Sequence, residues 1–479
     1  MNVGLIQEPP LEFGTGSHID IRFGLMNHGP LDILSEGAPQ RIRLGIVGTP
    51  DGVAGAQAWL DRIGRGIEAK ESRQPNLFPR FPGFGEGTNL PAALFIDSRL
   101  HGTVNQRELD SLFKSSNRNR VVAEVVDMFL WEMRRLAEKA SADVLVCAVP
   151  EGLIDYMEED RPVEEGSDEE TAGSAKLDFH NLLKAKAMEL GVPIQLLLPS
   201  TYDETKHRRQ KRRSDRIRRL QDEATRAWNI YTALYYKAGG VPWRIVRDPQ
   251  DLASCYVGVS FYNTLDREKL LTSTAQVFNE RGDGIVLRGG TAKRSKEDRQ
   301  VHMSGEDAHK LLDSALKTYR SEHRTLPARV VIHKTSPHND AEIGGFREAL
   351  QTHNVDSADF LSLGKSFTRL FRHGGYPPLR GTFLTLDRRT HALYTRGSVD
   401  FFSTYPGMYV PSPLRLRCDD AEQTPDFLAG EILALTKMNW NNTQFDNRNP
   451  ITVRAARGVG DILKYMGERN GQSRYSYYM

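Results

Sequence analysis

The chain has few cysteines and no long apolar run, and both absences narrow the class of protein. Its 479 residues include three cysteines, Cys147, Cys255 and Cys418, which stand far apart and form no Cys-x-x-Cys pair. This usage argues against a disulfide framework and against structural zinc, and it fits a reducing compartment. No stretch reaches the roughly eighteen apolar residues of a membrane-spanning helix, and Met1–Pro10 lacks the pattern of a secretory signal. We therefore expect a cytoplasmic protein.

The chain also has almost no net charge, because 64 basic residues nearly cancel 62 acidic ones and leave +2. Charge of one sign is instead concentrated in two segments. Residues 158–170 hold eight acids in thirteen positions, which is typical of a solvated loop. Residues 207–219 hold eight Lys or Arg in thirteen positions, a short distance downstream of the apolar segment 193–199. A cationic cluster at the carboxyl end of a strand indicates a site for a polyanion.

Within and just after this basic segment, three residues form a recognisable pattern. His207 and Lys211 are four residues apart and would share one face of a helix, and Gln221 follows ten residues later near the same angular position. Stacking on an aromatic ring tolerates any base, and an ammonium group attracts phosphate. The trio therefore suits a terminal phosphate with its first base stacked above it.

The hydrophobic patterns predict an α/β chain in two parts. In the first part, strands are expected at 41–47, 93–96, 142–149 and 194–198, and helices at 53–67, 120–139, 178–190 and 224–237. This alternation predicts a parallel sheet covered on both faces, with ligands at its carboxyl edge. In the second part, strands are expected at 254–261, 283–287, 329–332, 381–386 and 391–394, and helices at 305–321, 340–350, 425–438 and 450–466. That order suits a ribonuclease-H-like sheet.

Four further segments carry a resemblance to a known family. They are Leu77–Phe84 (LFPRFPGF), Tyr235–Trp243 (YYKAGGVPW), His333–Ser336 (HKTS) and Leu435–Thr443 (LTKMNWNNT), the last followed by Pro450–Thr452. In this order they resemble Argonaute proteins, in particular a short prokaryotic Argonaute built of MID and PIWI domains. The resemblance implies an N-terminal arm over 1–40, a Rossmann-like MID domain over 41–245 and a ribonuclease-H-like PIWI domain over 246–479. We expect no separate PAZ and N-terminal domains within these 479 residues.

The resemblance also assigns roles to residues. His207, Lys211, Gln221 and Lys237 would bind the 5′-phosphate of a guide strand and its first base, with the carboxylate of Met479 beside them. A Mg²⁺ ion at the phosphate would take Gln221 and Met479 as ligands, since hard cations prefer oxygen ligands. The candidates for the nucleic-acid channel are Arg208, Arg288, Lys293 and Arg294.

The PIWI half decides whether the protein cleaves nucleic acid. Relatives that cleave hold two Mg²⁺ ions in a nest of carboxylates. Here Ser260 and Thr335 stand where the resemblance implies acids, and Ala455–Arg457 offers no anionic ligand. We therefore expect no enzymatic activity in this chain. An alternative is a cleaving enzyme that uses other groups, such as Glu297, Asp298 and His302.

A MID–PIWI protein that does not cleave is expected to act as a sensor. The resemblance implies a guide RNA, a complementary single-stranded DNA target and a separate APAZ-domain effector subunit. The effector would be a Toll/interleukin-receptor-like or sirtuin-like NAD hydrolase, or a nuclease, acting in bacterial defence against plasmids and phages. The second alternative is an RNA-binding regulator that uses no guide. The sequence leaves open which effector is used, whether the guide is RNA or DNA, and whether target binding drives oligomerisation.

Overall fold

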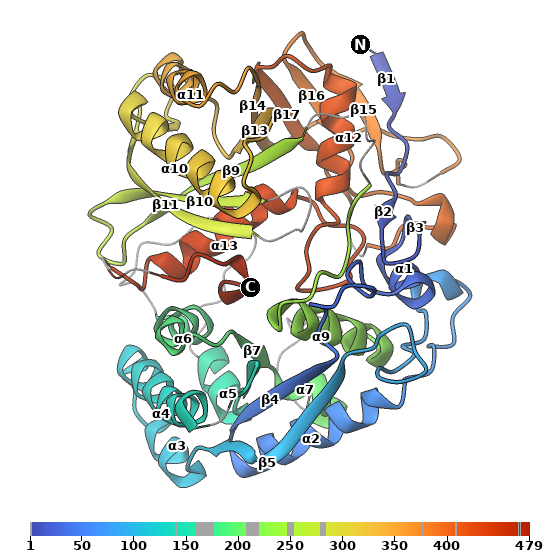
Figure 1. Ribbon diagram of the computed structural model, residues 1–479, viewed down its shortest axis with the longest axis vertical. Helices are drawn as coiled ribbons and strands as arrows, with labels where there is room; N and C mark the ends of the chain where they lie inside the picture. Colours follow the sequence, from blue (N-terminus) through green and yellow to red (C-terminus); the bar gives the residue numbers. More distant parts are fainter. Residues whose placement is uncertain are drawn as a thin grey trace.

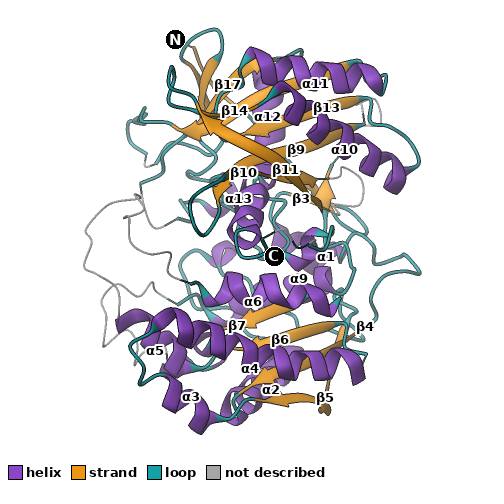
Figure 2. Ribbon diagram, turned by 90° about the vertical axis from the view of Figure 1, so that its left-hand side faces the viewer, coloured by secondary structure: helices purple, strands orange, loops and turns teal. Residues whose placement is uncertain are grey.

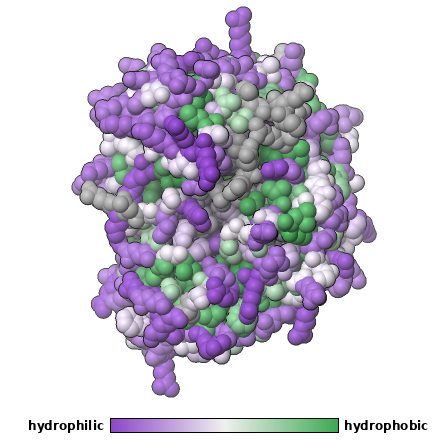
Figure 3. Space-filling view, viewed as in Figure 1, coloured by the Kyte–Doolittle hydropathy of each residue, from purple (hydrophilic) through white to green (hydrophobic). Residues whose placement is uncertain are grey.

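The computed structural model describes residues 2–139, 141–159, 177–206, 220–246, 253–277, 284–375, 377–407, 410–467, 469 and 471–479. Two lobes, each built around a β-sheet, lie one above the other along the longest axis (Figure 1). Seen from the side, helices flank both sheets, and the C-terminus lies between the lobes (Figure 2). Hydrophilic residues cover most of the face drawn in Figure 3, and apolar residues reach it in separate patches.

The four-stranded lobe contains the first half of the chain. Its strands are β4 (Arg41–Gly48), β5 (Ala93–Thr103), β6 (Val144–Ala148) and β7 (Ile194–Leu197). Its helices are α2 (Pro50–Gly64), α3 (Gln106–Leu112), α4 (Arg118–Lys139), α5 (Glu151–Glu159), α6 (Phe179–Ala187), α7 (Pro199–Tyr202) and α9 (Glu223–Lys237). Two short 3-10 turns are η1 (Pro75–Leu77) and η2 (Met188–Leu190). The strands are parallel in the order β5-β4-β6-β7. This confirms the Rossmann-like sheet, in which β6 is buried along its whole length as its unbroken apolar run predicts.

The ten-stranded lobe contains most of the second half. Its strands are β1 (Asn2–Leu5), β9 (Ser254–Asn263), β10 (Leu270–Val277), β11 (Gly284–Arg294), β12 (Val301–Met303), β13 (Arg329–Lys334), β14 (Ser357–Lys365), β15 (Thr382–Thr385), β16 (Thr390–Leu393) and β17 (Leu414–Asp420). Its helices are α10 (Gly305–His323), α11 (Asp340–Thr352), α12 (Pro425–Leu435) and α13 (Ile451–Leu463). The 3-10 turns are η3 (Asp400–Phe402) and η4 (Tyr475–Tyr477). The order is β1-β15-β16-β17-β14-β13-β9-β10-β11-β12. β13 runs parallel to both β9 and β14, while β10 and β11 are antiparallel. This arrangement confirms the ribonuclease-H-like sheet.

The first residues of the chain belong to both parts of the molecule. β1 pairs with β15, Asn2 opposite Thr385, and so forms one edge of the large sheet. Residues 11–12 (β2) and 17–18 (β3) form a small sheet with β8 (Arg244–Ile245), and α1 (Ile21–His28) follows. Within residues 2–40, β1 therefore pairs with the ten-stranded lobe, and β2 pairs with β8, which follows α9 in the chain.

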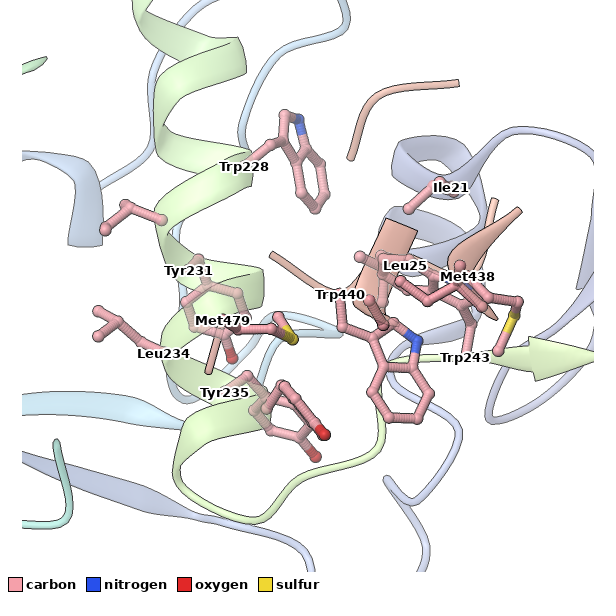
Figure 4. Packing of buried hydrophobic residues seen from close by; sticks show 14 of the residues in the cluster. Ile21, Leu25, Trp228, Tyr231, Leu234, Tyr235, Trp243, Met438, Trp440 and Met479 are labelled. Carbon is pink, nitrogen blue, oxygen red and sulfur yellow. The ribbon is translucent and has the colours of Figure 1, made fainter. Parts of the chain in front are cut away.

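The two lobes share hydrophobic clusters, and the largest of these contains the aromatic residues between them. It joins Trp228 and Tyr231 of α9 to Trp440 of the ten-stranded lobe and to Met479. In Figure 4, the Met479 side chain lies between Tyr231 and Tyr235 on one side and Trp440 on the other. Because aromatic side chains bury large apolar areas, this cluster fixes how the lobes sit against each other.

Close backbone contact positions α13 on the large sheet. A Cβ atom added at Gly258 of β9 would lie 2.0 Å from the carbonyl oxygen of Thr452 in α13, a distance that no side chain can occupy. Ser273 of β10 donates a hydrogen bond of 2.8 Å to the Ala456 carbonyl of the same helix. Among the described residues, no helix is both long and apolar enough to cross a membrane.

Candidate functional site

Of the four residues predicted to hold a guide 5′-end, Lys237 lies in an unusual environment for a lysine. It is the last residue of α9, and its side chain is 5% exposed. Its Nζ atom is buried and has no hydrogen-bond partner among the described residues. Burial, together with the nearby ammonium group of Lys184, lowers the pKa of Lys237 well below its ordinary value. His207, Lys211 and the channel residue Arg208 lie outside the described residues.

Lys184 of α6 is the second buried ammonium group. Its side chain is 4% exposed, and burial lowers its pKa to about 7. Its Nζ atom donates a hydrogen bond of 3.2 Å to the backbone carbonyl of Tyr478. The contact joins the four-stranded lobe to the end of the chain, where Tyr478 and Met479 are both buried.

His180 lies one helical turn before Lys184 on α6 and remains accessible to solvent. The surrounding protein and the ammonium groups of Lys184 and Lys237 lower its pKa to about 4. The imidazole ring is therefore neutral at pH 7. A neutral ring can stack on a base without adding a third positive charge to the cluster.

Gln195 of β7 carries an amide group on the face of the strand that packs toward α9. Alternate strand residues point to opposite faces, and Leu197 packs in the cluster that contains α9, so Gln195 also faces α9. Its Oε1 atom is buried without a hydrogen-bond partner in the described part of the chain. Gln195 therefore offers a free acceptor next to the helix that ends at Lys237.

The predicted pair Gln221 and Met479 has separate surroundings. The Gln221 amide oxygen accepts a hydrogen bond of 3.1 Å from Asn229, whose own oxygen accepts from the Thr443 backbone at 2.8 Å. Met479 packs instead against α9 and Trp440 (Figure 4). The described contacts do not join Gln221 with Met479, or either of them with Lys237 through a hydrogen bond.

The cluster formed by His180, Lys184 and Lys237, called the seam site below, is suited to an anion. Buried cations are normally paired with a carboxylate, because an unpaired charge in a low dielectric costs several kcal/mol. The hydrogen bond described for Lys184 goes to a neutral carbonyl, and Lys237 has none within the described ranges. A phosphate dianion entering here would neutralise both ammonium groups through charge-assisted hydrogen bonds.

His180, Lys184 and Gln195 were not predicted from the sequence, although a signal for them exists. His180 and Lys184 stand four apart in a predicted helix, and Gln195 follows eleven residues later at the start of a predicted strand. This repeats the aromatic, ammonium and amide pattern of His207, Lys211 and Gln221 almost interval for interval. Lys184 also lies among the apolar residues of its helix, where a cation stands out less than in the dense basic segment at 207–219.

The three described channel candidates lie on β11 of the ten-stranded lobe. Arg288 donates a hydrogen bond of 2.6 Å to the Gly467 carbonyl, close to the end of the chain. Lys293 and Arg294 are exposed near the end of the strand, opposite His302 and Val301 of β12. The structure therefore separates Arg288, near the seam, from the two residues at the far end of the hairpin.

The positions expected to hold catalytic acids in a cleaving relative lie at the ends of adjacent strands. Ser260 of β9 is buried, and the Thr335 backbone N–H donates to the Val259 carbonyl at 3.2 Å. Next to them, the buried Lys334 ammonium group is bonded to Glu342 at 2.6 Å and to the Pro337 carbonyl at 2.9 Å.

Of the residues named for the alternative nuclease, Asp298 and His302 contact this ion-pair network. His302 Nε2 lies 2.8 Å from Asp298 and its Nδ1 lies 3.2 Å from Glu342. Glu342 is fully buried and already forms an ion pair with the Lys334 ammonium group. In the part of the chain that the structure describes, no group of three or more His, Cys, Asp or Glu side chains could hold a metal ion.

Comparison with known proteins defines the fold. No family model and no curated protein matches the chain. Among solved structures it is similar to Clostridium butyricum Argonaute bound to a guide DNA and a 19-mer target DNA, with a TM-score of 0.67, 15% identity, and coverage of 99% of this chain and 54% of that one. It is also similar to Drosophila Piwi, with a TM-score of 0.59, 14% identity, and coverage of 99% and 56%. The chain thus has the MID–PIWI fold of Argonaute and Piwi proteins and spans about half the length of each.

Proposed function

We propose that this protein binds a nucleic-acid guide through its 5′-phosphate and uses the guide to recognise a complementary strand. The seam site carries the proposal, because it buries two ammonium groups that have no carboxylate partner among the described residues. His180 would stack on the first base, and Gln195 would contact the first nucleotide. The similarity to an Argonaute solved with guide and target DNA supports the same function.

The test compares 5′-phosphorylated and 5′-hydroxyl oligonucleotides of one sequence. We expect the protein to prefer the phosphorylated end and Lys184→Met to reduce that preference by about tenfold or more, since charge-assisted bonds to phosphate contribute roughly 1.5–3 kcal/mol. Lys186→Met is the matched control, because Lys186 lies on the same helix but pairs with Asp127 at 2.6 Å. Equal binding of the two ends by the parent protein would contradict the proposal.

The Mg²⁺ ion at the guide phosphate, with Gln221 and Met479 as ligands, stays a prediction. The seam site already supplies cationic charge through Lys184 and Lys237, and two ammonium groups disfavour a metal cation beside them. The Gln195 amide oxygen on β7 has no hydrogen-bond partner in the described chain, whereas the Gln221 oxygen accepts from Asn229. Measuring guide affinity with Mg²⁺ and with EDTA tests this: an unchanged affinity would remove the ion from the proposal.

The proposed biological role rests on the resemblance to short prokaryotic Argonautes. We propose an RNA guide, a single-stranded DNA target and an APAZ-domain effector subunit with NAD hydrolase or nuclease activity, acting in bacterial defence. The protein would hold the backbones while base pairing supplies the sequence specificity. Co-expression of the chain with the effector encoded beside it, followed by addition of guide and target, tests this. The effector activity should rise only when guide and target are complementary.

The absence of cleavage by this chain stays a prediction as well. Ser260 and Thr335 offer hydroxyl groups in place of carboxylates, and Lys334 holds Glu342 in an ion pair. Incubating the guide-loaded protein with labelled complementary DNA and Mg²⁺ or Mn²⁺ should give no specific product. A cut opposite the guide that is lost in Asp298→Asn would instead establish the alternative nuclease.

A further inference from the structure

The loop after β14 carries two phenylalanine side chains that protein atoms hardly cover. Phe367 is 90% exposed and Phe371 is 87% exposed. Single exposed apolar residues are common on protein surfaces, but two large rings in water within five residues form a distinct feature. Each exposed ring forgoes the stabilisation that burial would give it.

The backbone beneath these rings is held in place. Ser366, just before the first ring, is buried, and its N–H donates to the Pro413 carbonyl at 3.4 Å. The N–H of Leu370, just before the second ring, donates to the Tyr394 hydroxyl at 2.7 Å. The loop therefore presents both rings to solvent from anchored positions.

The chain segment that carries the rings contains charge of one sign. Residues 360–386 contain no Asp or Glu, and the side chains of Lys365, Arg369 and His373 are exposed among them. The Arg369 guanidinium donates to the carbonyls of Ser366 and Thr368 at 3.0 Å each, so its charge stays over the loop without being neutralised by those contacts. Alternating aromatic and cationic side chains are the features that hold a single nucleic-acid strand, with rings for the bases and cations for the phosphates.

The loop also lies at a suitable place in the fold. β14 runs parallel to β13 and β9, so its carboxyl end lies at the same edge of the sheet as Ser260 and Thr335. With β13 between them, β14 and β9 are about 10 Å apart. The carboxyl edge of such a sheet is where ligands of α/β proteins gather.

We propose that Phe367 and Phe371 stack on unpaired bases of a nucleic-acid strand while Lys365 and Arg369 attract its backbone. The inference rests on the proposed function for the presence of a guide or target strand, but it concerns a surface on the other lobe from the 5′-end. Stacking accepts every base, so this surface adds affinity without sequence preference.

The test uses the full-length protein and single-stranded oligonucleotides with either a 5′-phosphate or a 5′-hydroxyl, at one fixed salt concentration. Alanine substitution of a stacking ring lowers affinity by about fivefold to a hundredfold. We expect the double variant Phe367→Ala/Phe371→Ala to bind both oligonucleotides at least about tenfold more weakly while keeping the ratio between them. Phe367→Tyr/Phe371→Tyr should restore affinity, because tyrosine also stacks.

Two further measurements distinguish base stacking from an indirect loss of affinity. Oligonucleotides with 2-aminopurine should show quenched fluorescence on the parent and the tyrosine variant but not on the alanine variant. Trp131→Ala is the matched control, because Trp131 of α4 is 71% exposed on the other lobe and should not change affinity. An alanine variant that binds like the parent overturns the inference, and so does one that loses only a protein partner. If only the proposed function is wrong, the parent should bind the 5′-phosphate and 5′-hydroxyl oligonucleotides equally, and the alanine variant should still bind both more weakly than the parent.

Discussion

Lys184 and Lys237 carry ammonium groups in a place where positive charge costs free energy. Burial lowers both pKa values, and Lys184 adds repulsion to Lys237. Burial brings the pKa of Lys184 to about 7 in the ligand-free protein. A bound phosphate would favour the charged form of both side chains and raise their pKa values again.

This coupling predicts how guide binding depends on pH. A 5′-phosphate is a dianion above about pH 6, so its own charge is constant from neutral pH upward. Above pH 7 the ligand-free protein loses the Lys184 proton that the complex needs. The preference for 5′-phosphate over 5′-hydroxyl should therefore fall by up to about tenfold per pH unit as the pH rises from 7 toward 9.

The control is Lys184→Met, in which the preference should be lower and its pH dependence flatter. The same pKa shift gives the opposite sign for the stability of the ligand-free protein. The unfolded chain keeps the Lys184 proton up to about pH 10.5 while the folded chain loses it near pH 7, so the penalty on folding is complete below pH 7 and is relieved as the pH rises. A preference that stayed constant across this range would show that Lys184 is not titrated by binding.

At the scale of the elements, two adjacent glycines of α11 have opposite surroundings, and one of them packs against α10. A Cβ atom at Gly345 of α11 would lie 2.0 Å from the carbonyl oxygen of Gly305 at the start of α10. A Cβ atom at Gly344 would meet nothing within 4 Å. The contact between the helices thus requires glycine at position 345 but not at position 344.

Substitution of these glycines by alanine should change stability in opposite directions. Gly344→Ala should raise the free energy of unfolding by roughly 0.5–1 kcal/mol, because alanine loses less backbone entropy in a helix. Gly345→Ala should lower it by about 1–3 kcal/mol, because the helices must move apart. Urea denaturation of the two variants and the parent measures both effects. A stabilising Gly345→Ala would mean that α10 and α11 are not in the contact described.

The elements also show where sequence reasoning succeeds and fails. The apolar run at 142–149 correctly predicts a central strand, because a parallel strand covered on both faces is apolar throughout. β10 was not predicted, since its centre reads Thr272, Ser273 and Thr274, and these polar side chains are almost fully buried between β9 and β11. The burial of Lys184 was equally hidden, because it depends on Tyr478, 294 residues away.

At the scale of the whole molecule, the aromatic cluster at the seam couples the two lobes. The Trp440 ring lies 4.7 Å from the Tyr236 ring of α9 and 6.4 Å from the ring of Trp243. Tyr236 directly precedes Lys237, so the packing of Trp440 also holds one wall of the seam site. Rigid packing at this point would keep the anion site formed before any ligand arrives.

Trp440→Ala should therefore weaken both stability and guide binding. Loss of a buried tryptophan costs about 3–5 kcal/mol, and the cavity would loosen the contact between the lobes. We expect calorimetry to show the single transition of the parent separating into two, with reduced preference for a 5′-phosphate. Trp131→Ala, which removes an exposed ring, should leave both measurements unchanged. Retention of one transition at the parent temperature would show that the lobes are coupled elsewhere.

The pairing of β1 with β15 has a consequence for how the protein is made. Asn2 pairs with Thr385, so the ribosome must add more than 380 residues after the first strand before its neighbour exists. At roughly 5–20 residues per second, that delay is about 20–80 s. During translation the nascent β1, with the apolar side chains of Val3 and Leu5, has no native partner. The pairing that adds β1 to the edge of the large sheet therefore comes late, after the strands between β15 and β9 have been synthesised.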